Sequence, residues 1–230
     1  MPKTAEVAQD KDGFQWIIRQ NSLNGNILQD EIAANLKHEI NLYYKILELD
    51  AKDIFIDVGA HVGYYSIRMS KYFEKVLAVE PNITNYEGLC INTILNGKNG
   101  LSNISCINGM LYSEVKELYM NDSGSSSFVV ENKDEIDTTK KHYITNSETF
   151  DSVFSDITKD LKCVIKIDVE GAELEILKGA KESLQQFDNY WIIEYHDRNN
   201  TRDEVLKIMT EAQFKVKEEI VENKKFIFEK

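Results

Sequence analysis

The stretch DIFIDVGAHVGYYSIRMS, from Asp53 to Ser70, contains the features that decide the fold. It begins with a short apolar run, reaches an acid at Asp57 and turns through two glycines before helical spacing resumes. A strand, a glycine turn and a helix in this order form the first unit of an open α/β sheet. Ligands bind such sheets beyond the carboxyl ends of the strands, so this loop is the first candidate binding site.

Downstream of this loop, apolar runs alternate with segments of helical periodicity. We expect strands at Ile54–Val58, Lys75–Val79, Asn103–Ile107, Val115–Met120, Val164–Asp168 and Tyr190–Glu194, and helices at Gly63–Tyr72, Asn82–Asn96, Gly171–Phe187 and Arg202–Ala212. This alternation predicts βαβ units and a doubly wound, mostly parallel α/β sheet with helices on both faces. Two further strands, Phe214–Glu218 and Lys225–Phe228, are joined too tightly for a crossover and should form an antiparallel hairpin.

The chain divides into an N-terminal extension, residues 1–50, and one domain, residues 51–230. We expect residues 1–12 to lack regular structure, GFQWIIRQ at 13–20 to form a short strand, and residues 28–48 to form an amphipathic helix. A polar insertion at about 121–148, with GSSS at 124–127, interrupts the alternation. A long polar segment inside a compact domain is usually functional or mobile, so it is either a substrate loop or a solvated loop.

Composition excludes several classes of protein. Of the 230 residues, 42% are hydrophobic and 29% are charged, which is typical of a globular domain, and the formal net charge is −12. So acidic a chain is a poor general binder of nucleic acid. No apolar run reaches the roughly 20 residues of a membrane span. The three cysteines lack CxxC spacing, so we expect free thiols and a soluble, cytoplasmic protein.

The glycine loop reads D-x-G-x-x-x-G, with Gly59 directly after the first strand and Gly63 at the start of the helix. The dinucleotide-binding fingerprint requires a glycine where His61 stands, so the loop does not fit a pyrophosphate. It better suits a cofactor with a ribose and a charged tail but no phosphate. Glu80 ends the second strand, 23 residues after Asp57, where a carboxylate can accept hydrogen bonds from a ribose diol; otherwise it is a solvated acid at a strand end.

Three blocks, IDVGAHVG, VEPN and IKIDVEGAELEILKGA, resemble the FkbM-type methyltransferases, which are class I S-adenosylmethionine-dependent enzymes that act mostly on sugar or polyketide hydroxyls. The resemblance runs from about Asp53 to His196. It implies a seven-stranded sheet in the order 3-2-1-4-5-7-6, with strand 7 antiparallel. It also implies S-adenosylmethionine as cofactor, held by Asp57, Gly59, Ala60, His61, Gly63, Tyr64, Glu80, Pro81, Asn82 and, on the adenine side, Asn108. Because the sulfonium is a cation, an acidic rim at the strand ends suits it.

A second constellation ends the later strands, where Asp168 and Glu194 are followed by His196. If those strands are neighbours, the three side chains converge where the methyl group should point. O-methylation requires a hydroxyl relieved of its proton, by a side-chain base or by a divalent metal, and these residues could serve as catalytic groups or as metal ligands. In the alternative, Asp168 caps the next helix, Glu170 and Glu173 favour that helix through its dipole, and His196 is a surface residue.

We therefore expect methyl transfer from S-adenosylmethionine to a hydroxyl of a sugar, glycolipid or glycosylated metabolite. One alternative changes the acceptor to an amine, a carboxylate or an RNA nucleoside. Another is a non-catalytic cofactor-binding or scaffold protein. The presence of Asp57, Gly59, Gly63, Glu80 and Asp168 together argues against a decayed site.

Overall fold

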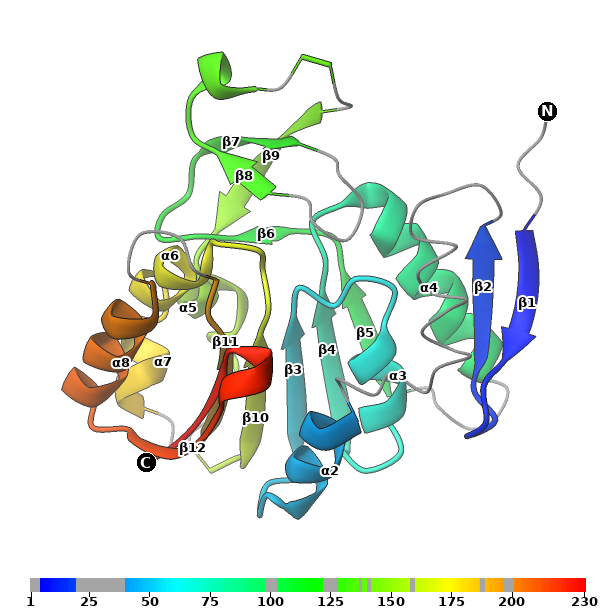
Figure 1. Cartoon of the computed structure of the whole chain (residues 1–230), viewed down its shortest axis with the longest axis horizontal. Coiled ribbons are helices and arrows are strands. Elements are labelled where there is room, and N and C mark those ends of the chain that lie inside the picture. Colours follow the sequence, from blue (N-terminus) through cyan, green and yellow to red (C-terminus); the bar gives the residue numbers. More distant parts are fainter. Residues whose placement is uncertain are drawn as a thin grey trace.

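The computed structural model describes residues 5–19, 40–97, 103–121, 128–136, 138–139, 142–157, 160–186, 189–196 and 201–230. At its centre lies a seven-stranded sheet in the order β12-β13-β11-β10-β3-β4-β5 (Figure 1). Its strands are β3 Ile54–Val58, β4 Lys75–Val79, β5 Ile104–Ile107, β10 Cys163–Ile167, β11 Tyr190–Glu194, β12 Lys215–Ile220 and β13 Lys225–Glu229. Strands β5, β4, β3, β10 and β11 run parallel, whereas β13 is antiparallel to both β11 and β12. The expected mostly parallel α/β sheet is confirmed.

The two middle strands show why the sheet forms. Every residue of β3 and of β10 is buried, and both strands are rich in β-branched residues. Strands covered on both faces read as continuous apolar runs rather than as alternating ones. Asp57 and Lys166 are the two charged residues in these apolar strands. They lie opposite each other in the β3–β10 register, inside the sheet.

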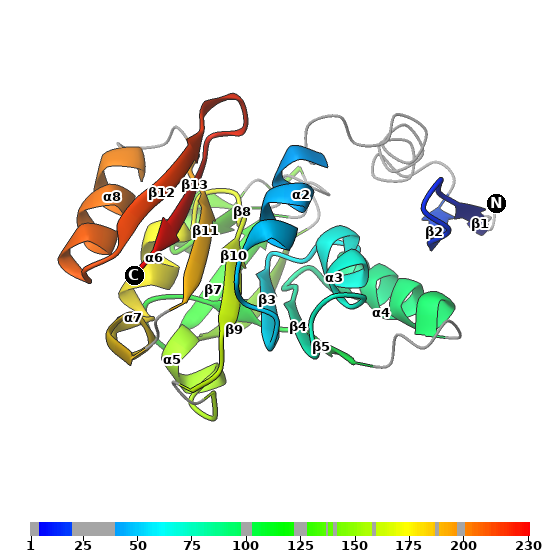
Figure 2. The same cartoon turned by 90° about the horizontal axis from the view of Figure 1, so that it is seen from below.

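Helices cover both faces of the sheet (Figure 2). One core cluster packs α5 Phe150–Val153, α6 Glu173–Lys178, α7 Lys181–Gln186 and α8 Thr201–Glu211 against one face. A second cluster packs α2 Ile40–Glu48 and α3 Tyr64–Met69 against the other. The longest described helix, α4 Ile83–Gly97, contacts β5 and β2. No helix of the described residues is long and apolar enough to cross a membrane.

The single helix expected over Gly171–Phe187 is wrong in detail, because the structure divides it into α6 and α7 at Gly179. A Cβ at this glycine would overlap the backbone carbonyl oxygen of Tyr112. Asp151 accepts the backbone N–H groups of Glu182 and Ser183, which satisfies the start of α7. The chain after β6 therefore packs directly against the break at Gly179, where no side chain fits.

A four-stranded accessory sheet, in the order β6-β9-β7-β8, lies above the carboxyl ends of the central strands (Figure 1). It comprises β6 Met110–Leu111, β7 Glu117–Asn121, β8 Phe128–Val130 and β9 His142–Glu148, with a 3₁₀ turn at Lys133–Glu135. The strand expected at Val115–Met120 is present as β7 but belongs to this sheet. The insertion expected at 121–148 thus begins earlier, near Met110, and its GSSS stretch lies outside the described residues.

The N-terminal extension contains an antiparallel hairpin of β1 Ala5–Gln9 and β2 Gln15–Arg19, at the opposite end of the molecule from α8 and β12 (Figure 2). The expected strand at 13–20 is confirmed over Gln15–Arg19, whereas the expected absence of structure in residues 1–12 is wrong for Ala5–Gln9; residues 1–4 lie outside the described part. Asp10 explains the difference, because its carboxylate accepts from the Phe14 N–H and the Trp16 Nε1–H and pairs with Arg68. Of the expected helix 28–48, the described part is Ile40–Glu48.

Candidate active site

A cavity of about 220 Å³ opens at the carboxyl ends of β3, β4 and β10 beneath the accessory sheet. Both sheets contribute to its walls, together with the start of α6. Its lining residues are Val58, Gly59, His61, Val79, Glu80, Pro81, Asn85, Gly109, Met110, Leu111, Met120, Val129, Asp168, Val169, Glu170, Ala172 and Ile176. The predicted cofactor residues Gly59, His61, Glu80 and Pro81 therefore meet the predicted catalytic residue Asp168 in one cavity.

Gly59 is required by two features of the turn after β3. Its φ of +81° lies in the left-handed region, and a Cβ there would overlap the backbone carbonyl oxygen of Asp168. The N–H groups of Gly59 and Ala60 both donate to the Val79 carbonyl oxygen at 3.0 Å, which ties the loop to β4. Gly63 also has a positive φ, +92°, and its packing partner is Leu89 rather than the cavity.

Asp57 does not line the cavity. Its carboxylate accepts the backbone N–H of Ser66 at 3.1 Å and the Ser66 hydroxyl at 2.6 Å, and it lies 3.4 Å from Lys166 Nζ. It thus fastens α3 to the sheet beneath the glycine loop. Ala60, Gly63 and Tyr64 are likewise outside the lining, and the Tyr64 ring stacks on Trp16.

Glu80 forms a buried wall of the cavity. Its two carboxylate oxygens accept the backbone N–H groups of His61 at 2.8 Å and Asn82 at 2.9 Å, and Asn85 Nδ2 lies 3.4 Å away. Burial raises the pKa of Glu80 to about 7, although these hydrogen bonds oppose the rise. The side chain is therefore held in a defined orientation at the end of β4.

Asn82 and Asn108 support this wall from behind and do not line the cavity. The Asn82 side chain accepts the backbone N–H groups of Thr84 and Asn85, which satisfies the start of α4. Asn108 Nδ2 donates to the backbone carbonyl of Glu80 at 2.8 Å. Both asparagines therefore fix the chain that carries Glu80.

His61 adopts a left-handed φ of +52° and is half-buried. Its Nε2 atom has no hydrogen-bond partner among the described residues. Burial lowers the pKa of His61 to about 4, so the ring is neutral at pH 7. An orphaned ring nitrogen in a cavity wall is a polar group that a bound ligand can satisfy.

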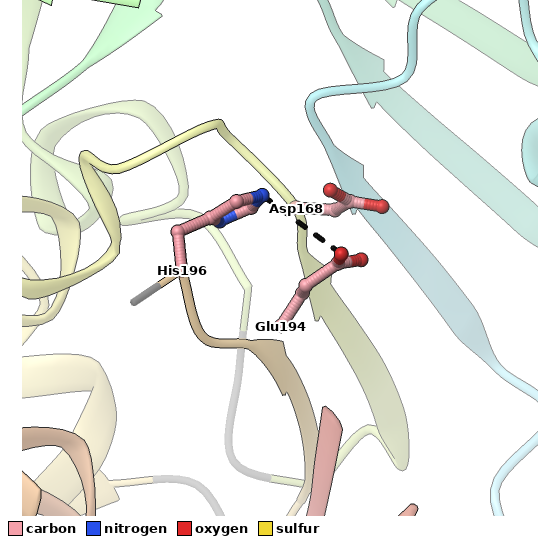
Figure 3. Close-up of side chains that lie close together, drawn as sticks. All are labelled: Asp168, Glu194 and His196. Atoms are coloured by element: carbon pink, nitrogen blue, oxygen red, sulfur yellow. Dashed lines mark ion pairs between the residues drawn. The ribbon is translucent and has the colours of Figure 1, made fainter. Parts of the chain in front are cut away.

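Asp168, Glu194 and His196 converge as predicted, and one ligand atom from each lies within 4.8 Å of the others (Figure 3). Asp168 follows β10, Glu194 ends the neighbouring strand β11, and His196 lies two residues later. Only Asp168 of the three lines the cavity. The adjacency of β10 and β11 is what brings the side chains together.

Each of the two carboxylates is paired with a buried lysine. Lys166 Nζ lies 3.2 Å from Asp168, and Lys225 Nζ lies 2.8 Å from Glu194. Burial alone would raise the pKa of Asp168, but the two lysines hold it well below its usual range. Burial and the neighbouring Asp168 charge raise the pKa of Glu194 to about 7, against the effect of Lys225. The lysine within the IKID strand thus belongs to the site.

His196 is surrounded by three glutamates. Its Nδ1 lies 2.6 Å from Glu173 Oε1, and its Nε2 lies 3.4 Å from Glu170 Oε2 and 3.8 Å from Glu194 Oε1. The hydrogen bond to Glu173 raises the pKa of His196 to about 9, although burial opposes it. The imidazole is therefore protonated at neutral pH.

Several residues that line the cavity were not predicted from the sequence. Asn85 lies on the first turn of α4, and Met110, Met120 and Val129 come from the accessory sheet. Apolar residues in short strands carry no signal that distinguishes a cavity wall from a core. Lys225 was also not predicted as a site residue, because its segment was expected only as the second strand of the terminal hairpin. Its side chain is 2% exposed. Its role depends on the antiparallel register that sets it opposite Glu194.

The fold is that of the methyltransferase-like α/β proteins. It matches a crystal structure of an FkbM methyltransferase from Methylobacillus flagellatus KT with a TM-score of 0.57 and 15% identity, over 78% of this chain and 44% of that chain. This chain thus corresponds to less than half of the solved protein, and at this identity the match shows the fold alone.

Sequence comparison gives the family. The model of the methyltransferase FkbM domain matches residues 57–216, and the chain belongs to this family of methyltransferases. Methyltransferase sdnD of Sordaria araneosa is 26% identical over 206 residues, which cover 75% of this chain and 78% of that protein. The hexuronic acid methyltransferase AglP of Haloferax volcanii is 31% identical over 172 residues, covering 72% and 65% respectively.

Proposed function

We propose that this protein transfers a methyl group from S-adenosylmethionine to a hydroxyl of a sugar, glycolipid or glycosylated metabolite. The observation that carries the proposal is the position of Asp168, which both lines the cavity and belongs to the Asp168–Glu194–His196 cluster. Asp168 would therefore connect the proposed cofactor cavity with the proposed acceptor residues. A relative named as a hexuronic acid methyltransferase supports a sugar acceptor.

The cavity fits the proposed cofactor. Its wall holds an oriented carboxylate, Glu80, suited to the hydroxyls of a ribose, and the orphaned Nε2 of His61 offers a further polar partner. The acidic residues Asp168 and Glu170 also line it, and no lysine or arginine does so among the described residues, so the wall does not repel a cationic group. When bound, S-adenosylmethionine supplies an electrophilic methyl group on its sulfonium.

The chain's own residues would handle the acceptor proton. Asp168 is ionised at neutral pH and is suited to accept a hydrogen bond from the hydroxyl, which orients it. Glu194, with a pKa of about 7, is better matched than Asp168 to take up the proton. His196 is protonated at that pH and so acts as a donor toward this pair rather than as the first base.

A divalent metal fits this cluster poorly. Asp168 and Glu194 already have their charges balanced by Lys166 and Lys225. Magnesium and manganese prefer a shell of oxygen ligands, and the cluster offers two carboxylates and a ring that holds its proton. The proposed reaction therefore uses no metal, and titration with and without magnesium tests this.

The test is calorimetric titration with S-adenosylhomocysteine, with and without magnesium. We compare the wild type with Glu80→Ala and with Glu222→Ala, which removes an exposed carboxylate outside the cavity lining. Glu80→Ala should weaken binding more than tenfold, which is about 1.4 kcal/mol, whereas Glu222→Ala should not change it. Absence of binding to the wild type would sink the proposal.

Acceptor assays then use radiolabelled S-adenosylmethionine with sugars and glycans that carry free hydroxyls, including hexuronic acids. Asp168→Asn should reduce methyl transfer while leaving the affinity for S-adenosylhomocysteine within about twofold. Labelling of an amine, a carboxylate or an RNA in preference to every hydroxyl acceptor would overturn the choice of acceptor but not the choice of cofactor.

A further inference from the structure

Glu173 is a buried acid that the reaction outlined above does not use. It is the first residue of α6 and has no exposed surface. The chain reaches it through two residues with left-handed φ values, Glu170 at +56° and Gly171 at +111°. This turn carries the chain from the end of β10 to α6 and places the Glu173 side chain inside the protein. A buried carboxylate is costly unless it is paired, so its partners indicate its role.

Both hydrogen-bond partners of Glu173 among the described residues contact the same carboxylate oxygen. Oε1 accepts the Gly171 N–H at 3.0 Å and lies 2.6 Å from Nδ1 of His196. Oε2 has no hydrogen-bond partner among the described residues. Among the described residues, His196 is the one cationic group that forms an ion pair with Glu173.

This contact decides which ring nitrogen of His196 faces the cluster. The protonated imidazole carries a hydrogen on Nδ1, and this nitrogen lies 2.6 Å from Glu173 Oε1, so it donates to that carboxylate. Nε2 is then on the side of the ring that faces Glu194 and Asp168 (Figure 3), and it lies 3.4 Å from Glu170 Oε2 and 3.8 Å from Glu194 Oε1. A carboxylate behind a histidine fixes the orientation of the ring in many active sites.

We propose that Glu173 is a positioning residue for methyl transfer, whose buried carboxylate holds the Nδ1–H of His196 and thereby aims Nε2 at the Asp168–Glu194 pair. This inference rests on the proposed function, because that pair is where the acceptor hydroxyl binds. Glu173 itself does not line the cavity.

A role in the helix dipole alone does not account for this arrangement. Glu175 lies in the same first turn of α6 and is partly exposed, where it pairs with Lys178 at 2.5 Å. An acid needs only to be near the helix N-terminus to favour the dipole, and exposure does not prevent it. Full burial against a histidine is the additional feature of Glu173, and Glu175→Gln is therefore the matched control.

The first measurement is proton–nitrogen NMR of protein labelled at histidine, with the His196 signals assigned by their loss in His196→Gln. The wild type and Glu175→Gln should show a slowly exchanging, strongly downfield proton on Nδ1. Glu173→Gln should move it upfield because a neutral acceptor forms a weaker hydrogen bond, and Glu173→Ala should abolish it. If the downfield Nδ1 signal persists in Glu173→Ala, or if the strongly downfield signal of the wild type belongs to the Nε2 proton instead of the Nδ1 proton, the inference is wrong.

The second measurement separates kcat from KM in methyl transfer. Glu173→Gln and Glu173→Ala should lower kcat about 10- to 100-fold, as expected for loss of a group behind an active histidine, with KM for S-adenosylmethionine within twofold. Equal kcat values for Glu173→Ala and Glu175→Gln would reduce Glu173 to a structural role. Failure of the proposed function is distinguishable, since it appears as a wild type that does not bind S-adenosylhomocysteine.

Discussion

Replacement of Gly59 by alanine tests the close approach of the glycine loop to β10. A Cβ at this position would overlap the Asp168 carbonyl oxygen and lie 2.9 Å from its carbonyl carbon and 3.2 Å from Val169 Cγ1. The first two atoms belong to the backbone of a buried strand end, so they cannot move away as a flexible side chain would. The loop must therefore shift relative to β10.

Two terms contribute to the cost of this substitution. A left-handed φ costs an alanine about 1–2 kcal/mol relative to its preferred regions, and overpacking against a rigid neighbour costs about 1–3 kcal/mol. We expect a loss of about 2–5 kcal/mol in the free energy of unfolding, which in a domain of this size lowers Tm by roughly 4–20 °C.

The assay is urea unfolding together with calorimetric titration of S-adenosylhomocysteine. Gly97→Ala is the control, because a Cβ there meets nothing within 4 Å and the residue lies at the end of α4. This control should leave stability unchanged or raise it by up to about 1 kcal/mol. A Gly59→Ala protein within about 0.5 kcal/mol of the wild type would refute the reasoning about the close approach.

Three further predictions concern Glu80, Lys166 and Asn96. The pKa of Glu80 is about 7 in the folded protein and about 4.5 in the unfolded chain, so its contribution to stability is fully present below about pH 4.5 and is lost as pH rises through 7. The free energy of unfolding of the wild type relative to Glu80→Gln should therefore fall by up to about 3 kcal/mol between pH 4.5 and 8. A constant difference over this range would contradict the prediction. Lys166→Met leaves buried Asp57 without its cation and should cost about 3–5 kcal/mol in urea unfolding, whereas a cost below about 1 kcal/mol would show that this ion pair is unimportant. Asn96→Ala removes hydrogen bonds to both backbone groups of Gln15, about 1–3 kcal/mol, and should speed amide exchange in β2 at least tenfold while exchange in β3 stays unchanged; equal protection in both proteins would exclude this docking role.

Much of the central sheet could be predicted from local pattern. The apolar runs at Ile54–Val58 and Lys75–Val79 and at Tyr190–Glu194 appear as strands with the same bounds. A strand buried on both faces is easily recognised in the sequence as a continuous apolar run, because a polar residue inside it is costly. The accessory sheet was less predictable, since its strands are short and partly exposed, as the alternating exposure of His142–Glu148 shows.

The candidate site was likewise predicted only in part. Gly59, His61, Glu80 and Asp168 were predicted, and they meet in one cavity because the carboxyl ends of parallel strands lie at one edge of the sheet. The separation of Asp57 from that cavity was not predicted. Asp57 lies one residue before the end of β3, and its side chain points to Ser66 and Lys166. Side-chain direction near a strand end depends on the packing of the next helix.

The sequence by itself determined the α/β alternation, the glycine turn and the acids that end the strands, because these depend on residue periodicity and on backbone conformation near each position. Only the tertiary structure decided which charges pair. Lys225 meets Glu194 through an antiparallel register between strands, and Glu173 meets His196 across 23 residues of chain. A buried charge is stable only beside its partner, and that partner is selected by packing between elements that the local sequence does not specify.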